Sequence, residues 1–309
     1  MVQENKIKKI PLIVIGGPTA SGKSSLSIRL AQQINGEIIN ADAFQIYKGM
    51  DIGTAKITNK EMQGIRHHMI DIISPNESFS VSEFVDGAKN AIQRIHTSGK
   101  VPIIVGGTGL FLNALLYDFE FGQAPKNDEI RKKYMQILET RGKEHLHSLL
   151  MDINPERASS IHANDTKKVI RALEVLEQGG SFEQVRQNSN YEFLFICLST
   201  DREILYKKIN ERVDDMIRSG LEDEVQNLLK NGVSFDCQAM QAIGYREWKY
   251  IFDGTATREE VIELIKKNSR NYAKRQLTWF RHCQDIVWFD SQCQEQAIKY
   301  IKGKGYING

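Results

Sequence analysis

A glycine-rich loop that directly follows a short apolar segment constrains the fold of this chain more than any other feature. The segment runs from Ile10 to Ile15, and residues 24–34 behind the loop repeat apolar side chains at helical spacing. The loop matches G-x-x-x-x-G-K-[ST], in which backbone N–H groups, a helix N-terminus and a lysine ammonium converge on one anion, while the last hydroxyl can hold Mg²⁺. This context disfavours a chance match on an ordinary glycine turn. We therefore expect a polyphosphate site formed by Gly17, Pro18, Thr19, Ala20, Ser21, Gly22, Lys23 and Ser24.

The alternation of strand and helix continues along the chain. Further short apolar segments predict strands at residues 37–40, 101–105, 191–198 and 286–289. Helical spacing predicts helices at residues 110–117, 201–230, 238–252 and 258–282, with one more helix closing the chain. Continuous apolar strands separated by helices are typical of a parallel sheet that is covered on both faces. We predict an α/β fold with a P-loop NTPase-like parallel sheet and helices on both faces.

A helical insertion interrupts this pattern. Between Phe119 and Asn190 the strand signal is absent, and charged segments with helical spacing, separated by Pro and Gly, replace it. About 70 residues are within the usual size of a small domain. We therefore expect residues 1–118 and 191–309 to form the P-loop core with its C-terminal helices, and residues 119–190 to form a helical insertion domain. The residues before the first strand are expected to be a tail.

Composition excludes several classes of protein. The mean hydropathy is −0.40, and no apolar run approaches the ~18 residues that span a bilayer, so we expect no membrane partner. Four cysteines occur without a C-x-x-C pair, which argues against a disulfide framework or a zinc knuckle. Cysteines of this kind are typical of buried thiols in the reducing cytoplasm, where we expect the protein to act.

The distribution of charge is more informative than its sum. With 41 Lys and Arg against 39 Asp and Glu, the net charge of +2 by itself argues against a nucleic-acid partner. Residues 266–281, however, contain six basic side chains and no acidic one. On a helix, Lys267, Arg270, Lys274 and Arg281 would share one stripe, which suits contact with nucleic-acid phosphates. A solvated helix face is the alternative.

Two further features lie at predicted strand ends, where open α/β sheets bind their ligands. Asp42 is the only carboxylate at the carboxyl ends of the first three predicted strands. It could be a magnesium ligand, a general base or a helix N-cap. The third strand ends in Gly-Gly-Thr-Gly at residues 106–109, which brings backbone and the hydroxyl of Thr108 close to a ligand; the alternative is a turn with Thr108 as an N-cap.

Taken together, the ordered motifs resemble the tRNA dimethylallyltransferase (tRNA isopentenyltransferase) family over most of the chain. The most specific are Asp-Ile-Gly-Thr-Ala-Lys at residues 51–56 and Ala-Lys-Arg-Gln-Leu-Thr-Trp at residues 273–279. The other matching stretches are the P-loop, residues 42–50, 67–71, 105–109, 162–165, 169–174 and 242–246, and residues 272 and 280–281, which extend the last motif to Tyr272–Arg281. The resemblance implies transfer of a dimethylallyl group from dimethylallyl diphosphate to the N6 amine of the adenosine 3′ of the anticodon, position 37, in tRNAs that read UNN codons.

The resemblance also implies roles for particular residues. Asp42 would be the general base, Thr19, Lys23 and Arg212 would stabilise the departing diphosphate, and Ser24 would hold Mg²⁺. The P-loop would then cradle the donor's diphosphate and not ATP, which accounts for the missing Walker-B carboxylate. Gln45 and Thr108 would line a flipped-out adenine. The complete set of implied tRNA-binding residues is Asp42, Ala43, Phe44, Gln45, Thr108, Lys167, Lys168, Arg171, Arg270, Lys274, Arg275 and Arg281. We expect the enzyme to act as a monomer.

The sequence departs from the family pattern at two positions, and other functions remain open. Ala43 replaces the usual Ser, which removes one hydroxyl contact with tRNA, and Ala163 replaces a common Pro. A P-loop kinase of small molecules would share the loop and the strand–helix layout but would require ATP. A third possibility alkylates free adenine nucleotides, although the basic helix and the insertion favour a polymer. An RNA-binding module without activity would leave the P-loop unexplained.

Overall fold

The computed structural model describes residues 9–117, 124, 126–180, 182, 190–283 and 285–305. The chain divides into two compact units: Met1–Tyr117 together with Ser189–Gly309, and Asp118–Asn188. The expected N-terminal tail lies outside the described residues except for Lys9, as do residues 118 and 119, where the insertion is expected to begin. None of the helices in the described ranges is long and apolar enough to cross a membrane.

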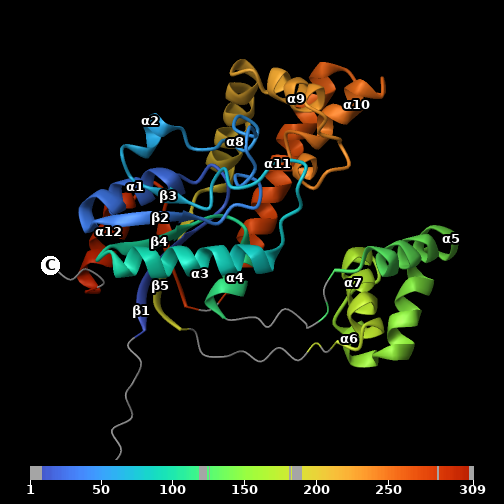
Figure 1. The fold of residues 1–309 in the computed structure, drawn as a ribbon. Coiled ribbons are helices and arrows are strands. Elements are labelled where there is room, and N and C mark those ends of the chain that lie inside the picture. Colours follow the sequence, from blue (N-terminus) through green and yellow to red (C-terminus); the bar gives the residue numbers. More distant parts are fainter. Residues whose placement is uncertain are drawn as a thin grey trace, which may run out of the picture. The chain divides into compact units, whose positions relative to one another are not determined.

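A six-stranded sheet forms the centre of the larger unit (Figure 1). Its strand order is β3-β2-β4-β1-β5-β6, and every neighbouring pair is parallel. The strands are β1 (Ile10–Gly16), β2 (Gly36–Asn40), β3 (His67–His68), β4 (Val101–Val105), β5 (Tyr191–Ser199) and β6 (Ile286–Asp290). Because β1 lies between β4 and β5, the loop that follows β1 is placed at the centre of the carboxyl edge. The predicted parallel α/β fold is confirmed.

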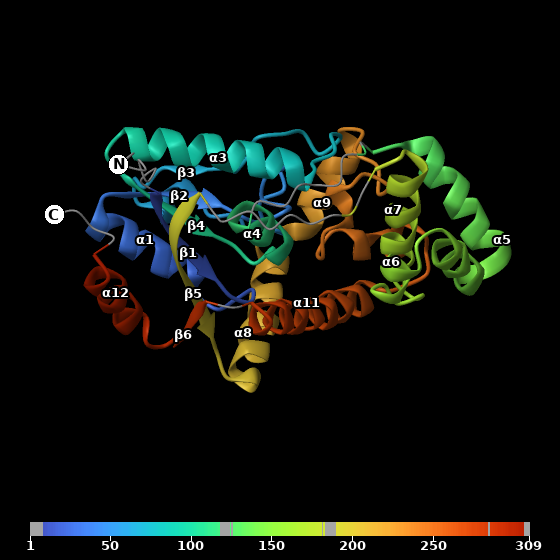
Figure 2. The same ribbon diagram turned by 90° about the horizontal axis from the view of Figure 1, so that it is seen from below.

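Helices cover both faces of this sheet (Figures 1 and 2). On one face α1 (Lys23–Ile34) and α12 (Gln294–Gly303) pack against alternate strand residues such as Ile13, Ile103 and Ile196. The opposite face is covered by α3 (Val81–Thr97) and α4 (Gly109–Leu116). The predicted spacing did not reveal α3 or the two-residue strand β3. A capping box at Ser80 and Glu83 marks the start of α3 and could have indicated it.

A second apolar cluster packs beyond the carboxyl edge of the sheet. It joins residues 44–52 to α8 (Arg202–Arg218), α9 (Leu221–Lys230) and the first half of α11 (Arg258–Arg281). One helix over residues 201–230 was predicted, and this was wrong. α8 ends at Arg218, and α9 begins after Gly220, whose φ of 93° breaks the helical conformation. The predicted helix over residues 238–252 is also wrong. Two 3-10 turns, Ala239–Gln241 and Arg246–Trp248, precede a short α10 (Lys249–Phe252). The four-residue helix α2 (Asn59–Met62) completes this unit.

The smaller unit is helical, as the insertion was predicted to be. It contains α5 (Asp128–Ile153), which is interrupted at Gly142, α6 (Pro155–Ser159) and α7 (Thr166–Glu177). Leu146, Leu150 and Leu173 are fully buried between these helices. The carboxylate of Glu174 is also buried, and it is paired with two arginines.

Candidate active site

The P-loop turns from β1 into α1 through a strained backbone. Ala20 has φ 61°, in the left-handed region, which costs a residue that carries a side chain about 1–3 kcal/mol. Ser21 Oγ and Lys23 Nζ both donate hydrogen bonds to the carbonyl oxygen of Pro18, at 2.8 and 2.6 Å. Gly22 occupies the N-cap of α1 and has no side chain, so the first amides of this helix remain available to an anion.

Two half-buried cations, Lys23 and Arg212, face the same region. Burial and the guanidinium of Arg212 lower the pKa of Lys23 to about 8, while Asp42 and Cys197 act in the opposite direction. Burial also lowers the pKa of Arg212, against the raising effect of Asp42 and Glu61. Two like charges in a poorly hydrated site are unfavourable unless an anion compensates them. The electrostatics of the site therefore favour a ligand with more than one negative charge.

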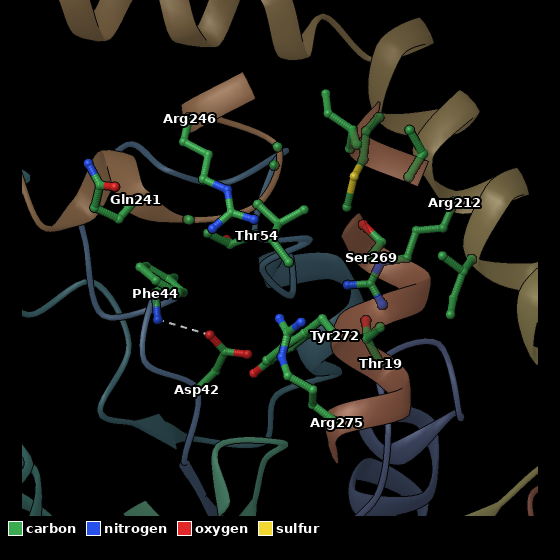
Figure 3. A pocket seen from close by; sticks show the side chains of 18 residues that line it. Thr19, Asp42, Phe44, Thr54, Arg212, Gln241, Arg246, Ser269, Tyr272 and Arg275 are labelled. Atoms are coloured by element: carbon green, nitrogen blue, oxygen red, sulfur yellow. Dashed lines mark hydrogen bonds between the residues drawn. The ribbon is translucent and has the colours of Figure 1, made fainter. Parts of the chain in front are cut away.

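Asp42 follows β2, and its two carboxylate oxygens have different roles. Oδ1 accepts a hydrogen bond from the backbone amide of Phe44 at 2.9 Å (Figure 3). It also accepts one from the backbone amide of Gln45 at 3.4 Å, and the two bonds fix a turn. The residues after Asp42 form a turn and not a helix, so the alternative of a helix N-cap is wrong. Since the hydrogen bonds of the turn use Oδ1, Oδ2 can accept a proton or a hydrogen bond from a ligand.

Thr108 supports the same turn from the neighbouring strand. Its Oγ1 accepts a hydrogen bond from the backbone amide of Ala43 at 3.2 Å, and it makes no side-chain capping bond to α4. Thr108 does occupy the N-cap position of α4, as the alternative predicted, but its hydroxyl is used for the turn after Asp42 and not for capping. Gln45 donates to the backbone carbonyl groups of Thr54 and Ala55, at 3.1 and 3.4 Å. These two residues position the backbone around Asp42.

A cavity of about 260 Å³ lies next to Asp42 (Figure 3). Its lining has a polar side and an apolar side. The polar side is formed by Thr19, Asp42, Arg212, Arg246, Tyr272 and Arg275. Side chains of Phe44, Ile209, Val213, Met216 and Ile265 contribute the apolar side. The structure thus gathers five residues with sequence-predicted roles around one cavity: Thr19, Asp42, Phe44, Arg212 and, from the basic helix, Arg275.

A second cavity of about 750 Å³ borders Ser24, and Arg212 and Met216 line both cavities. Within the residues that the structure describes, no group of three or more His, Cys, Asp and Glu side chains is arranged to hold a metal ion. Mg²⁺ commonly takes only one or two protein ligands and completes its shell with substrate phosphates and water. The hydroxyl of Ser24 at the start of α1 therefore fits a magnesium ion that is bound together with a polyphosphate.

One carboxylate holds the segment of residues 51–56, in which Gly53 and Thr54 line the cavity. Glu224 on α9 accepts hydrogen bonds from the backbone amides of Asp51, Ile52 and Gly53, at 2.9, 2.8 and 3.1 Å. It also accepts the hydroxyl hydrogen of Tyr245 at 2.5 Å. Burial, followed by the charge of Glu224, raises the pKa of Tyr245, so this hydroxyl stays a donor. All four partners of the carboxylate are donors.

Replacing Glu224 with Gln is expected to lower the free energy of unfolding by about 2 kcal/mol, because the amide nitrogen cannot accept and the ionic character of the bonds is lost. Glu222→Gln, which breaks a surface ion pair with Arg258 at 2.8 Å, is a matched control with an expected loss of roughly 0–1 kcal/mol. Urea titrations of the two variants compare these effects. Equal losses would contradict the role given to Glu224.

Lys56 shows that part of this segment is structural. Its side chain is 4% exposed, and Nζ donates to the carbonyl oxygen of Tyr47 and to the carboxylates of Asp51 and Asp71, at 2.7, 2.6 and 2.5 Å. A buried ammonium is tolerated only when it is paired and hydrogen-bonded in this way. The Asp-Ile-Gly-Thr-Ala-Lys motif therefore stabilises a loop whose other members, Gly53 and Thr54, line the 260 Å³ cavity.

The basic helix predicted from residues 266–281 is the second half of α11. Lys266 is paired with Asp214 and Glu263, at 2.9 and 3.0 Å, and Arg270 donates to Asn210 Oδ1 at 2.6 Å. Four of the six cations are exposed: Lys267, Lys274, Arg275 and Arg281. An exposed positive face is thus present, although Lys266 is neutralised by its acidic neighbours.

The implied tRNA-binding residues of the insertion lie on α7, in the other unit. Arg171 is paired with Glu174 at 2.6 Å and also donates to the carbonyl oxygen of Ala124, so it stabilises the insertion itself. Lys168 forms an exposed ion pair with Asp165 at 2.7 Å. Lys167 is exposed on the same helix turn.

Sequence reasoning assigned no role to Gln276 or Tyr272, although both lie in the recognised motif on α11. Gln276 is 5% exposed and occupies the face of α11 that buries Ala273 and Phe280. A polar side chain at a position where helical spacing predicts an apolar one is a detectable signal. Tyr272 lines the cavity, and burial followed by the charge of Asp42 raises its pKa to about 12.

Known proteins resemble the chain over nearly its whole length. A family model described as IPP transferase matches residues 45–283. A curated tRNA dimethylallyltransferase of Clostridioides difficile is 46% identical over 307 residues, which cover 96% of this chain and 99% of that protein. The corresponding protein of Bacillus subtilis is 46% identical over 287 residues, 91% of each chain.

Solved structures of similar proteins agree with these sequence matches. The crystal structure of full-length tRNA isopentenylpyrophosphate transferase from Bacillus halodurans has a TM-score of 0.74 and 44% identity, covering 96% of this chain and 97% of that one. A eukaryotic dimethylallyltransferase acting on tRNA gives 0.76 at 30% identity, with 95% of this chain and 80% of the other covered. From this fold and this agreement along the sequence, it follows that the chain belongs to the IPP transferase family.

Proposed function

We propose that this enzyme transfers a dimethylallyl group from dimethylallyl diphosphate to the N6 amine of the adenosine 3′ of the anticodon, position 37, in tRNAs that read UNN codons. One observation carries the proposal: a carboxylate, anion-binding groups and an apolar wall meet in a single cavity. A purely apolar cavity of ~150 Å³ can bind benzene, so about 260 Å³ accommodates a five-carbon alkyl group. The tRNA dimethylallyltransferases that match the chain support the same reaction.

The reaction forms one bond and breaks another. The adenine N6 attacks C1 of the dimethylallyl group, the C1–O bond breaks, and diphosphate leaves with the electron pair. Asp42 accepts the proton that N6 loses, because its free oxygen faces the cavity. Thr19, Lys23 and Arg212 stabilise the charge on diphosphate. Ser24 would hold Mg²⁺, which would supply further neutralisation of the charge on the diphosphate.

The adenosine must leave the anticodon-loop stack to reach a cavity of this kind. Phe44, Gln45 and Thr108 are proposed to guide the flipped base, since each one lines the cavity or fixes the turn around Asp42. The exposed face of α11 and Lys167 and Lys168 of the insertion are proposed to bind the backbone of the stem-loop. All these groups come from one chain, and we propose that a monomer suffices.

The affinity for tRNA is expected to fall steeply with salt. With Lys266 paired internally, five cations of α11 remain. At ~0.7 counterions per contact these five contribute about −3 to −4 to the slope of log affinity against log salt, and Lys167 and Lys168 would add to it. Filter binding between 50 and 300 mM salt, roughly the range in which such slopes are linear, measures it. Lys274→Gln should make the slope shallower by about 0.7, whereas Lys266→Gln should leave it unchanged. A wild-type slope shallower than about −1 would mean that α11 does not bind RNA phosphates.

Two alternative enzymes are separated from the proposal by their substrates. A P-loop kinase requires ATP, and an enzyme of free nucleotides accepts AMP or ATP as the alkyl acceptor. The test is incubation with radiolabelled dimethylallyl diphosphate, Mg²⁺ and unmodified tRNA in the absence of any nucleoside triphosphate. We expect label in tRNA. Transfer to free AMP alone, or a requirement for ATP, would contradict the proposal.

A further inference from the structure

The buried amide of Gln276 connects two loops at the carboxyl edge of the sheet. Its Oε1 accepts a hydrogen bond from the backbone amide of Thr19 at 2.9 Å, and its Nε2 donates to the carbonyl oxygen of Gly107 at 3.0 Å. Thr19 belongs to the P-loop after β1, and Gly107 follows the neighbouring strand β4. Because one partner donates and the other accepts, the orientation of the amide is determined. One side chain of α11 therefore fixes the spacing of both loops.

The packing at Gly107 shows that this connection leaves no free space. A Cβ atom added at Gly107 would lie 2.1 Å from Gln276 Nε2, far inside van der Waals contact. The backbone of Gly107 does not have a positive φ, so the glycine is needed for the close approach of the amide and not for its conformation. Gly107 and Gln276 therefore form one structural unit.

The connection extends from Gln276 to the turn of Asp42. Tyr272, one helical turn earlier on α11, lines the cavity with Thr19 and Asp42; burial raises the pKa of its hydroxyl, and the side chains of Thr108 and Gln276 lower it. Thr108 in turn accepts the backbone amide of Ala43, next to Asp42. Hydrogen bonds thus join Gln276 to Thr19 and to Gly107, and the next residue after Gly107, Thr108, is bonded to the backbone beside Asp42. The same helix carries the exposed cations Lys274 and Arg275.

We propose that Gln276 is a positioning residue, which fixes the separation between Thr19 and Asp42 and thereby aligns the leaving diphosphate with the attacking amine. The inference rests on the proposed function, in which these two residues act at opposite ends of the transferred group. Displacement of a reacting group by about 1 Å can reduce a rate about 100-fold. Loss of Gln276 should therefore lower kcat with little effect on substrate binding.

Gln276→Met retains the length of the side chain but removes both hydrogen bonds. We expect kcat for transfer from dimethylallyl diphosphate to tRNA to fall by about tenfold or more, with the KM for tRNA within about threefold of the wild-type value. Gly107→Ala should give the same pattern, because its methyl group displaces the amide. Val261→Ala, in a fully buried position at the start of α11, is the control for reduced stability; its kcat should be unchanged.

Gln276→Glu supplies a readout that a general loss of stability would not produce. The new carboxyl group can donate to the Gly107 carbonyl only when it is protonated, and both burial and that carbonyl oxygen raise its pKa. The ratio of the kcat of this variant to that of the wild type should therefore rise by about one to two orders of magnitude as the pH falls from 8 to 6, through the raised pKa of the new carboxyl group. Taking the ratio removes any pH dependence that is common to both enzymes.

The outcomes separate the two claims. A folded Gln276→Met enzyme with a kcat within about twofold of the wild type would overturn the positioning role. If this variant does not fold, a pH-independent kcat ratio for Gln276→Glu would overturn it equally. A wild-type enzyme that transfers no label to tRNA would instead contradict the proposed function on which the inference rests.

Discussion

Replacing Asp42 with Asn is expected to reduce kcat by about 100- to 10,000-fold, the usual contribution of a general base. The Asn side chain has the same shape, and its oxygen can still accept the amides of Phe44 and Gln45, so the turn after β2 should be retained. It cannot accept the proton that the adenine N6 loses. Single-turnover transfer from labelled dimethylallyl diphosphate measures this loss without interference from product release.

Binding and stability distinguish this chemical role from a structural one. The Kd for tRNA of Asp42→Asn should stay within about threefold of the wild type, since a proton acceptor contributes chiefly in the transition state. Asp42→Ala should lose the same activity and, in addition, about 1 kcal/mol of stability, because the turn amides lose their acceptor. An Asp42→Asn enzyme with wild-type kcat would remove Asp42 from the proposed mechanism.

Replacing Lys23 with Met is expected to lower kcat/KM for dimethylallyl diphosphate by about 100- to 1,000-fold, since one donor to the leaving group and its charge are lost. The Kd for tRNA should change little, because Lys23 lies at the start of α1 and not on the exposed face of α11. Pre-steady-state measurements at varied concentrations of dimethylallyl diphosphate separate the effect on this donor from any effect on tRNA. Unchanged use of the donor would contradict the assignment of the P-loop to diphosphate.

The lowered pKa of Lys23 predicts a pH dependence for the same step. The charged ammonium is the form that binds diphosphate, and the pKa of about 8 in the free enzyme means that this form is lost above pH 8. The value of kcat/KM for the donor should therefore fall about tenfold per pH unit above that value. Bound diphosphate favours the ammonium, so kcat at saturating donor should decline only at higher pH. Coincident pH profiles for kcat and kcat/KM would contradict this account.

Local sequence signals were sufficient for the central architecture. Strands such as β1 and β4 are buried on both sides and so appear as continuous apolar runs, and the P-loop contains its own turn and helix start. The boundary between α8 and α9 was missed because apolar spacing continues across it, although Gly220 forces the chain to turn. Residues 238–252 have helical spacing, yet the amide of Gly244 bonds to the carboxylate of Glu247 and the chain forms 3-10 turns instead.

The candidate site required more than local signals. Asp42 and the P-loop could be placed from sequence because both lie at strand ends. The partners that hold the P-loop and the loop at residues 51–53 could not be placed, since Gln276 bonds to a residue 257 positions away and Glu224 bonds to residues 171–173 positions away. Lys266 and Arg171 look free in the sequence, but the fold gives each of them an acidic partner. Charge counts along one helix therefore overestimate the charge available to RNA.

The central claim is that the P-loop of this family member serves a prenyl diphosphate, and that the alkyl group goes to one adenosine of tRNA. The most direct test is the transfer reaction without nucleoside triphosphates, followed by digestion of the tRNA to nucleosides and by mapping of the labelled position. The account predicts label in N6-dimethylallyladenosine at the adenosine 3′ of the anticodon of UNN-reading tRNAs, and none after that adenosine is replaced by guanosine. Label in another nucleoside or position, or no label without ATP, would contradict it.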